Sequence, residues 1–169
     1  WPYVGSTLLP TYLWETAVLI SRTVLLALLL GVSTAWLVSA NDFPGRGLFR
    51  WALVLPLALP TYISAITFSA LWGPTGTCSL WVAEHTDLHI DLLTPSGLAY
   101  VLALVLFPYV YLPARAAFSG GMSAQLDAAR MLGGGAVRRA FRVAFPLALP
   151  AIGGGGLLVA MEVLNDYGA

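Results

Sequence analysis

The sequence has very little charge. Only 9% of its 169 residues are charged, whereas 59% are hydrophobic. A soluble domain of this size carries about 25% charged residues, so this chain has too few to cover a surface that faces water. All eight basic residues are arginine, and the net charge of zero gives no electrostatic reason to expect nucleic acid as a partner. The composition therefore predicts that lipid surrounds much of the molecule.

Several chemical motifs are missing as well. Cys78 is the only cysteine, which excludes an internal disulfide and a cysteine-rich metal site. The sequence has no Gly-x4-Gly-Lys-Ser/Thr phosphate loop, so the chain cannot by itself power transport with ATP. It also has neither His-Glu-x-x-His nor Gly-x-Ser-x-Gly, so an intramembrane enzyme would lack a catalytic set. We expect no catalytic residue, no resident metal and no bound cofactor, and a passive membrane scaffold stays open at this point.

Four apolar stretches approach the roughly 20 residues that a helix needs to cross a bilayer. Prolines and glycines within them are tolerated in membranes because neighbouring helices satisfy the freed backbone groups. The glycine run 153–156 permits either close helix packing or simple flexibility. We predict an all-α polytopic transmembrane bundle with spans at about residues 23–40, 51–72, 96–112 and 146–164. Residues 3–20, interrupted by Pro10 and Glu15, are expected to be an interfacial or linker segment.

The arginines predict the orientation, because cytoplasmic loops collect positive charge. Seven of the eight arginines fall between the first two spans or between the last two. The loop between the second and third spans has no arginine and contains Glu84, Asp87 and Asp91. Both arginine-bearing loops are therefore expected on the cytoplasmic side. Only Arg22 lies at the outer edge, where this rule does not place it.

The stretch of about residues 114–145 differs from the spans around it. Ser123 is a suitable N-cap for a short helix over residues 124–132, and three glycines would end that helix. A second helix over residues 136–145, halted by Pro146, would carry apolar residues on one face and arginines on the other. Periodicity alone favours an amphipathic helix resting on anionic lipid headgroups.

The residues of this stretch also follow a known spacing. Asp127-Ala128-Ala129, three residues, Gly133, nine residues, Val143, one residue and Phe145-Pro146 resemble the EAA loop of bacterial binding-protein-dependent ABC importer permeases. In that family the pattern is Glu-Ala-Ala, three residues, Gly, nine residues, Ile, one residue and Leu-Pro. The chain departs from it at positions 127, 143 and 145, and each change keeps the charge or the apolar character.

This resemblance implies a permease of the type I ABC importer class, with about four spans and a cytoplasmic helix–glycine–helix coupling loop. By resemblance, the loop docks on a cytoplasmic ATPase dimer that binds the ATP, and an extracytoplasmic solute-binding protein delivers the substrate. A second permease half, fused or separate, would complete the pathway in the bacterial inner membrane. The residues that would couple to the ATPase are Asp127, Ala128, Ala129, Arg130, Gly133 and Pro146.

Softer stretches suggest a subgroup. Residues 41–46, 55–60 and 161–168 are similar to ferric-iron type permeases, which implies ferric iron as substrate, with thiamine or another small solute as the alternative. Family permeases continue with at least one further span. We therefore expect the chain to be part of one transmembrane domain of a longer protein.

Two polar groups remain to be weighed. Glu162 and Asp166 lie four residues apart near the outer end of the fourth span, with Asn165 and Tyr167 beside them. Ionisable groups at membrane depth usually face a cavity or partner, so these four residues either line the pathway or anchor the span at the water boundary. His85 and His89 have helical metal-ligand spacing, but outer loops often contain histidine and we predict no metal site there.

Overall fold

The computed structural model describes residues 9–73, 75–86, 94–120, 131 and 140–167. In this part of the chain every regular element is a helix, which confirms the predicted all-α fold. The elements are α1 (Leu9–Ala40), α2 (Arg46–Ala52), the 3-10 turn η2 (Leu55–Ala58), α3 (Thr61–Trp72), α4 (Thr77–Thr86), α5 (Pro95–Leu106), α6 (Pro108–Gly120), the π-helical turn η3 (Ala140–Ala144) and α9 (Phe145–Tyr167).

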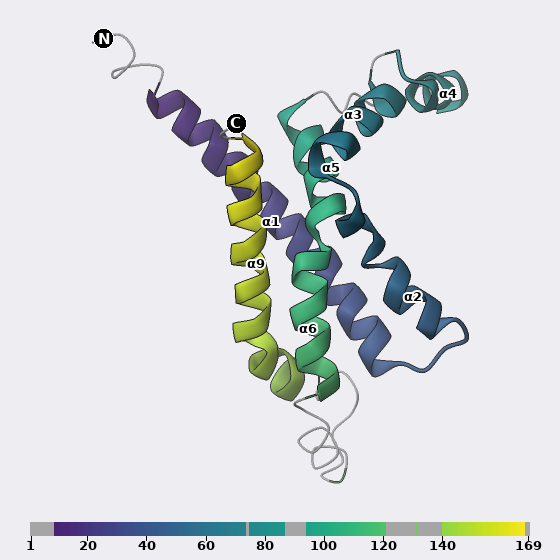
Figure 1. The fold of residues 1–169 in the computed structure, drawn as a ribbon, viewed down its shortest axis with the longest axis vertical. Coiled ribbons are helices and arrows are strands. Elements are labelled where there is room, and N and C mark those ends of the chain that lie inside the picture. Colours follow the sequence, from purple (N-terminus) through teal and green to yellow (C-terminus); the bar gives the residue numbers. More distant parts are fainter. Residues whose placement is uncertain (1–8, 74, 87–93, 121–130, 132–139, 168–169) are drawn as a thin grey trace.

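Three helices form the centre of the molecule. The long helix α1 crosses it diagonally, and α6 and α9 pack on α1 and on each other (Figure 1). Helix α5 leads into α6 and also packs on α1. Helices α2 and α3 lie on the side of α5 and α6 away from α9, and α4 projects from the end of α3 (Figure 1). The central bundle therefore joins segments that are far apart in the sequence.

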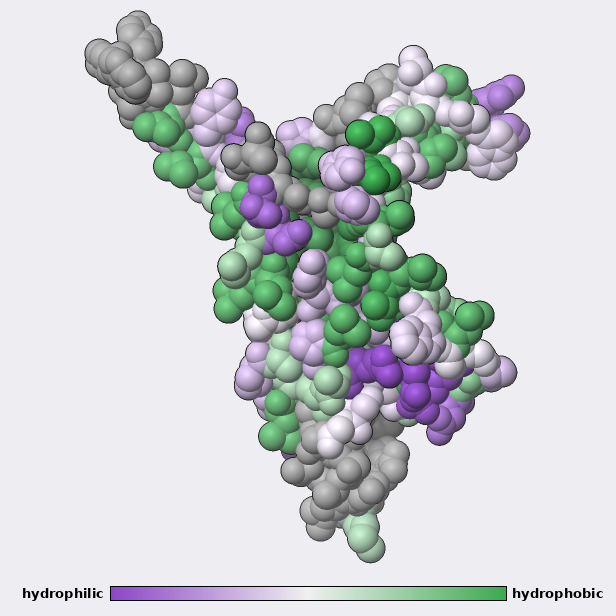
Figure 2. Space-filling model, in the orientation of Figure 1, coloured by the Kyte–Doolittle hydropathy of each residue, from purple (hydrophilic) through white to green (hydrophobic). Residues whose placement is uncertain are grey.

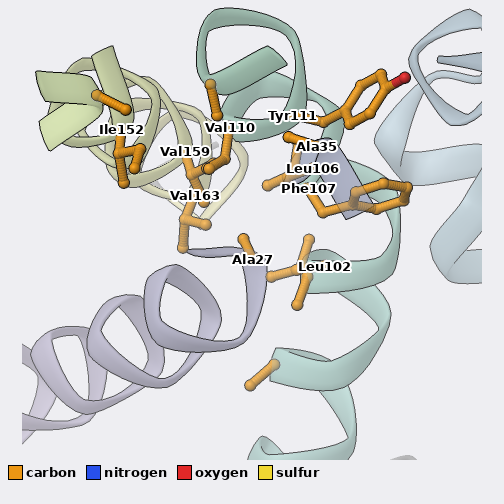
Figure 3. Close-up of a cluster of buried hydrophobic side chains, with 14 of the residues drawn as sticks. Ala27, Ala35, Leu102, Leu106, Phe107, Val110, Tyr111, Ile152, Val159 and Val163 are labelled. Atoms are coloured by element: carbon orange, nitrogen blue, oxygen red, sulfur yellow. The ribbon is translucent and has the colours of Figure 1, made fainter. Parts of the chain in front are cut away.

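Small side chains make the close packing of this bundle possible. On α1 every fourth residue from Leu19 to Ala35 is buried, and four of these in succession are Thr23, Ala27, Gly31 and Ala35. Figure 3 shows Ala27 and Ala35 of α1 among larger apolar side chains of α5, α6 and α9. Small residues at such spacing let helix backbones approach closely, which drives association where lipid tails are as apolar as leucine.

Gly31 of α1 and Gly155 of α9 both lie against Val110 of α6. A Cβ atom on Gly31 of α1 would lie 2.7 Å from the Cβ of Val110, and one on Gly155 of α9 would lie 2.8 Å from the Val110 Cα. Both positions therefore require glycine at this helix separation. Close packing of the glycine run is confirmed at Gly155, whereas a Cβ on Gly153 or Gly154 would meet nothing within 4 Å.

Helix α1 is longer than the sequence analysis predicts. It begins at Leu9, so residues 9–20 continue into the first predicted span as one helix and do not form a separate linker, whereas their interfacial position stays a prediction. Pro10 stands in the first turn, where a residue without an amide hydrogen costs the helix no hydrogen bond. Glu15 is exposed and does not disturb the helix. At 32 residues and about 1.5 Å per residue, α1 is about 48 Å long, more than the hydrocarbon core needs.

The second and third predicted spans are not single straight helices. Residues 51–72 divide among α2, η2 and α3, and the segments 46–58 and 62–85 meet at an angle of 91°. Pro60 precedes α3 and lacks the amide that would continue a helix. Helices α5 and α6 meet at 43°, at the point where Pro108 follows Phe107. Helix α6 then continues to Gly120, so residues 114–120 of the predicted coupling stretch are helical.

The fourth predicted span also begins differently. The turn η3 runs directly into α9, so Pro146 does not halt a helix as predicted but lies in the first turn of α9. Proline is tolerated there for the same reason as Pro10. Pro150 lies inside α9, which continues past it to Tyr167. Residues 140–167 therefore form one continuous helical segment, made of η3 and α9.

Two of the described helical segments are long and apolar enough to cross a membrane, α1 and residues 141–165. Each bent pair would add one more if it counts as a single span. Leucines of α1 and α9 such as Leu25, Leu29 and Leu157 are exposed, and Figure 2 shows hydrophobic residues over much of the middle of the molecule. Exposed apolar surface on this scale is typical of contact with lipid or partner subunits. The number of four spans stays a prediction.

Candidate functional site

The two described ends of the predicted coupling loop meet at one end of the bundle. Helix α6 ends at Gly120, and the chain is described again, apart from Met131, from η3 onward. Most of the predicted coupling residues, Asp127, Ala128, Ala129, Arg130 and Gly133, lie outside the described residues, and their role stays a prediction. Pro146 is described, is exposed and stands where α9 begins.

Aromatic side chains tie these two ends to α1. The ring centroids of Trp36 and Phe118 are 5.3 Å apart at an interplanar angle of 81°, an edge-to-face contact. Phe145 lies 5.7 Å from each of them. Phe141 stacks on Phe145 at 5.3 Å. Such pairs contribute about 0.5–1.5 kcal/mol each beyond the area they bury. We name Trp36, Phe118, Phe141 and Phe145 the aromatic cluster, and it joins α1, α6, η3 and α9.

A polar contact extends the same junction. Ser39 near the end of α1 and Ser119 near the end of α6 bring their hydroxyl oxygens within 3.2 Å. Arg46 then closes the chain turn after α1, because its guanidinium donates to the Val38 carbonyl oxygen at 2.7 Å and pairs with Asp42. The Ser39–Ser119 contact holds the α6 end of the predicted loop against α1, and the Trp36–Phe145 contact holds the α9 end.

The predicted pathway residues lie at the opposite end of α9. Glu162 is half-buried, and it has no hydrogen bond or ion pair with another described residue. Asn165 is exposed. Asp166 and Tyr167 belong to α9 by their backbone, but their side chains lie outside what the structure describes. The choice between a pathway lining and an interfacial anchor therefore stays a prediction.

The histidine pair is described only in part. His85 stacks on Trp81 with centroids 4.5 Å apart, and its Nδ1 lies 2.9 Å from the Trp81 carbonyl oxygen. Both contacts occupy His85 within its own helix α4. Among the described residues no three histidine, cysteine or acidic side chains gather at one place. His89, Asp87 and Asp91 lie outside this part of the chain.

The aromatic cluster and the contact of Gly31 with α6 are not among the features predicted from the sequence. Trp36, Phe118 and Phe145 come from three separate stretches, and only the tertiary arrangement brings them together. Gly31 does carry a local signal, since it continues the spacing of Ala27 and Ala35 along α1. That spacing was available from the sequence alone.

The chain is similar to permease proteins of transport systems. No family model matches it. It is 28% identical over 171 residues to a probable sulfate transport system permease protein cysT of Nephroselmis olivacea, covering 99% of this chain and 59% of the relative. It is 31% identical over 146 residues to a putative 2-aminoethylphosphonate transport system permease protein PhnU of Salmonella choleraesuis, covering 83% and 51%. It is 27% identical over 157 residues to the sulfate transport system permease protein CysW of Escherichia coli K12, covering 93% and 53%.

The chain thus spans about half the length of the curated relatives it matches. These relatives are permease proteins of transport systems and not enzymes, in agreement with the prediction that this chain is not itself an enzyme. Their names support an importer permease in general, and they give sulfate and 2-aminoethylphosphonate where the softer stretches suggested ferric iron. Similarity to permeases and the apolar helices together indicate a multi-pass membrane protein.

Proposed function

We propose that this chain is part of the membrane-spanning permease subunit of a binding-protein-dependent ABC importer in the bacterial inner membrane. The observation that carries the proposal is the similarity of most of the chain to transport permeases. The spacing from Asp127 to Pro146 supports it independently, because it resembles the loop through which such permeases contact their ATPase. The chain binds no cofactor in this proposal, and the ATP belongs to the partner ATPase dimer.

The geometry of the bundle suits this role. Residues 121–139 connect α6 to η3, and both flanking segments are packed on α1 through the aromatic cluster. A displacement of the loop by the closing ATPase dimer would therefore act on three helices together. In this mechanism a solute-binding protein delivers substrate outside, a second permease half completes the pathway, and loop movement alternates the side that is open.

The substrate we favour is a tetrahedral oxyanion. Two of the relatives named above belong to sulfate transport and one to 2-aminoethylphosphonate transport. Sulfate and the phosphonate group share tetrahedral geometry and negative charge, so one kind of pathway suits both. Ferric iron, the substrate suggested by residues 41–46, 55–60 and 161–168, and thiamine are the competing candidates.

Uptake by cells that contain the full-length permease with its ATPase and binding protein tests this proposal. Labelled sulfate, 2-aminoethylphosphonate, ferric iron and thiamine are offered in parallel. We expect uptake of one of the two oxyanions. Replacement of Gly133 by leucine should lower it by about 5- to 150-fold, which corresponds to the usual coupling free energy of about 1–3 kcal/mol between linked sites.

The matched control is Gly134→Leu, because the family pattern fixes glycine at position 133 and leaves position 134 open. Full uptake in the Gly133→Leu variant would contradict the role of the loop. Uptake of ferric iron or thiamine alone would keep the transporter and overturn the oxyanion assignment.

A further inference from the structure

Arg22 lies between two cavities where α1 packs on α5. Each cavity has a volume of about 300 Å³, and Arg22 lines both. Its guanidinium donates to the Ser96 hydroxyl oxygen at 3.0 Å, which uses one of its five N–H donors. Arg22 is also the arginine that the predicted orientation leaves at the outer edge of the bundle. Arg22 is exposed, so its charge can reach a ligand in either cavity.

The first cavity contains opposite charges that are not paired with each other. Glu15 and Arg22 both line it, two helical turns apart on the same side of α1, and Trp14 lies beside them. Neither charged group forms an ion pair with another described residue. Glu15 is not needed to cap the start of α5, since the Thr94 hydroxyl already accepts the Gly97 N–H at 3.1 Å. The cavity suits a ligand that carries both a phosphate-like anion and an ammonium group.

The second cavity is mostly apolar. Leu25, Leu26, Ala99 and Tyr100 line it with Arg22 and Ser96, and on α1 it lies further toward the middle of the helix. The stretch from residue 23 to residue 40 measures about 27 Å at 1.5 Å per residue, close to the thickness of the hydrocarbon core of about 30 Å. Glu15 and Arg22 then lie at the level of the lipid headgroups, and the apolar cavity lies at the level of the acyl chains.

We propose that these two cavities bind one zwitterionic phospholipid of the outer leaflet. Its phosphate contacts Arg22, its ammonium group lies between the Glu15 carboxylate and the Trp14 ring, and one acyl chain fills the apolar cavity beside Tyr100. Trp14 is 72% exposed at the headgroup level, where tryptophan is enriched. Tyr100 is 55% exposed and offers its ring to the acyl chain. Free 2-aminoethylphosphonate has the same two charged groups but no acyl chain, so it would leave the second cavity unfilled.

Native mass spectrometry of the full-length protein, purified in detergent and mixed with equal amounts of phosphatidylethanolamine and phosphatidylglycerol, tests this site. We expect the protein to retain phosphatidylethanolamine preferentially. Arg22→Gln should lower retention of both lipids by about tenfold, the effect of losing one charge-assisted hydrogen bond. Glu15→Gln should leave total retention unchanged and abolish the preference for the zwitterionic lipid. Because Glu15 is exposed, this second variant tests the site without disturbing the fold.

The matched control is Arg142→Gln, which removes an exposed arginine of η3, away from both cavities, and should behave as the unaltered protein. Equal retention and equal preference in the unaltered, Arg22→Gln and Glu15→Gln proteins would overturn the proposal. Displacement of the bound lipid by millimolar 2-aminoethylphosphonate would replace the lipid with a small solute as the occupant. The retention and preference results do not depend on which substrate the transporter carries, because no substrate is present in those samples.

Discussion

The turn between α1 and α2 depends on a few individual residues. Gly45 has a φ of 88°, in the left-handed region that residues with a side chain avoid. Arg46 holds the turn against the end of α1, since it donates to the carbonyl oxygens of Val38 and Ser39. A tight turn fixed in this way sets where α2 begins relative to the bundle.

We expect Gly45→Ala to destabilise the protein by about 1–2 kcal/mol, the cost of left-handed backbone for an L-residue. Gly47→Ala is the matched control, because Gly47 lies in α2, has no positive φ and has no neighbour within 4 Å of an added Cβ. Alanine in the helix should stabilise the protein by up to about 1 kcal/mol. Thermal unfolding of the full-length protein in detergent should therefore show shifts of opposite sign. Shifts of the same sign would contradict the role of the turn.

The glycine run of α9 offers a second pair of variants. A Cβ on Gly155 would lie 2.8 Å from the Val110 Cα and 2.9 Å from the Tyr109 carbonyl oxygen, both backbone atoms that cannot move aside without separating α9 from α6. We expect Gly155→Ala to destabilise the protein by about 1–3 kcal/mol, as overpacking does. Gly154→Ala meets nothing within 4 Å and should be neutral or slightly stabilising. Equal midpoints of thermal unfolding for the two variants would contradict this prediction, because they would show that α9 and α6 can separate at little cost.

At the level of elements, proline explains where prediction from the sequence succeeds and where it fails. Composition and apolar length were sufficient for the all-α fold. Pro10 was taken as a helix breaker although it occupies a first turn, so the start of α1 was missed. For the same reason a helix end was predicted at Pro146, although the helix continues through η3 into α9. Which turn of a helix a proline occupies depends on where the helix begins, and tertiary packing decides that.

The opposite error occurred at Pro60. The sequence predicted one span through Pro60, yet the chain bends by 91° near it.

Of the candidate sites, the sequence spacing predicted the coupling residues and the Glu162 group, but no local pattern indicated the aromatic cluster or the cavities beside Arg22. These features arise where side chains from separate helices meet. A single sequence contains no direct signal of such contacts.

At the scale of the whole molecule, the aromatic cluster is where movement of the predicted loop would reach the bundle. Trp36 is central, because it contacts Phe118 of α6 and Phe145 of α9 from its place on α1. Two such contacts contribute about 1–3 kcal/mol together. If the chain acts as proposed, loss of the Trp36 ring should therefore weaken the link between ATP hydrolysis and the spans.

We expect Trp36→Leu to lower substrate uptake per ATP hydrolysed by about 5- to 150-fold, with ATP hydrolysis itself retained. The measurement is uptake and ATP hydrolysis together, in proteoliposomes that contain the full-length permease, its ATPase and its binding protein. Trp51→Leu is the matched control, because Trp51 of α2 is 79% exposed and lies outside the aromatic cluster. If Trp36→Leu lowered uptake and hydrolysis in parallel, the cluster would hold the fold without carrying the coupling, since a broken link spares the ATPase and a damaged bundle does not.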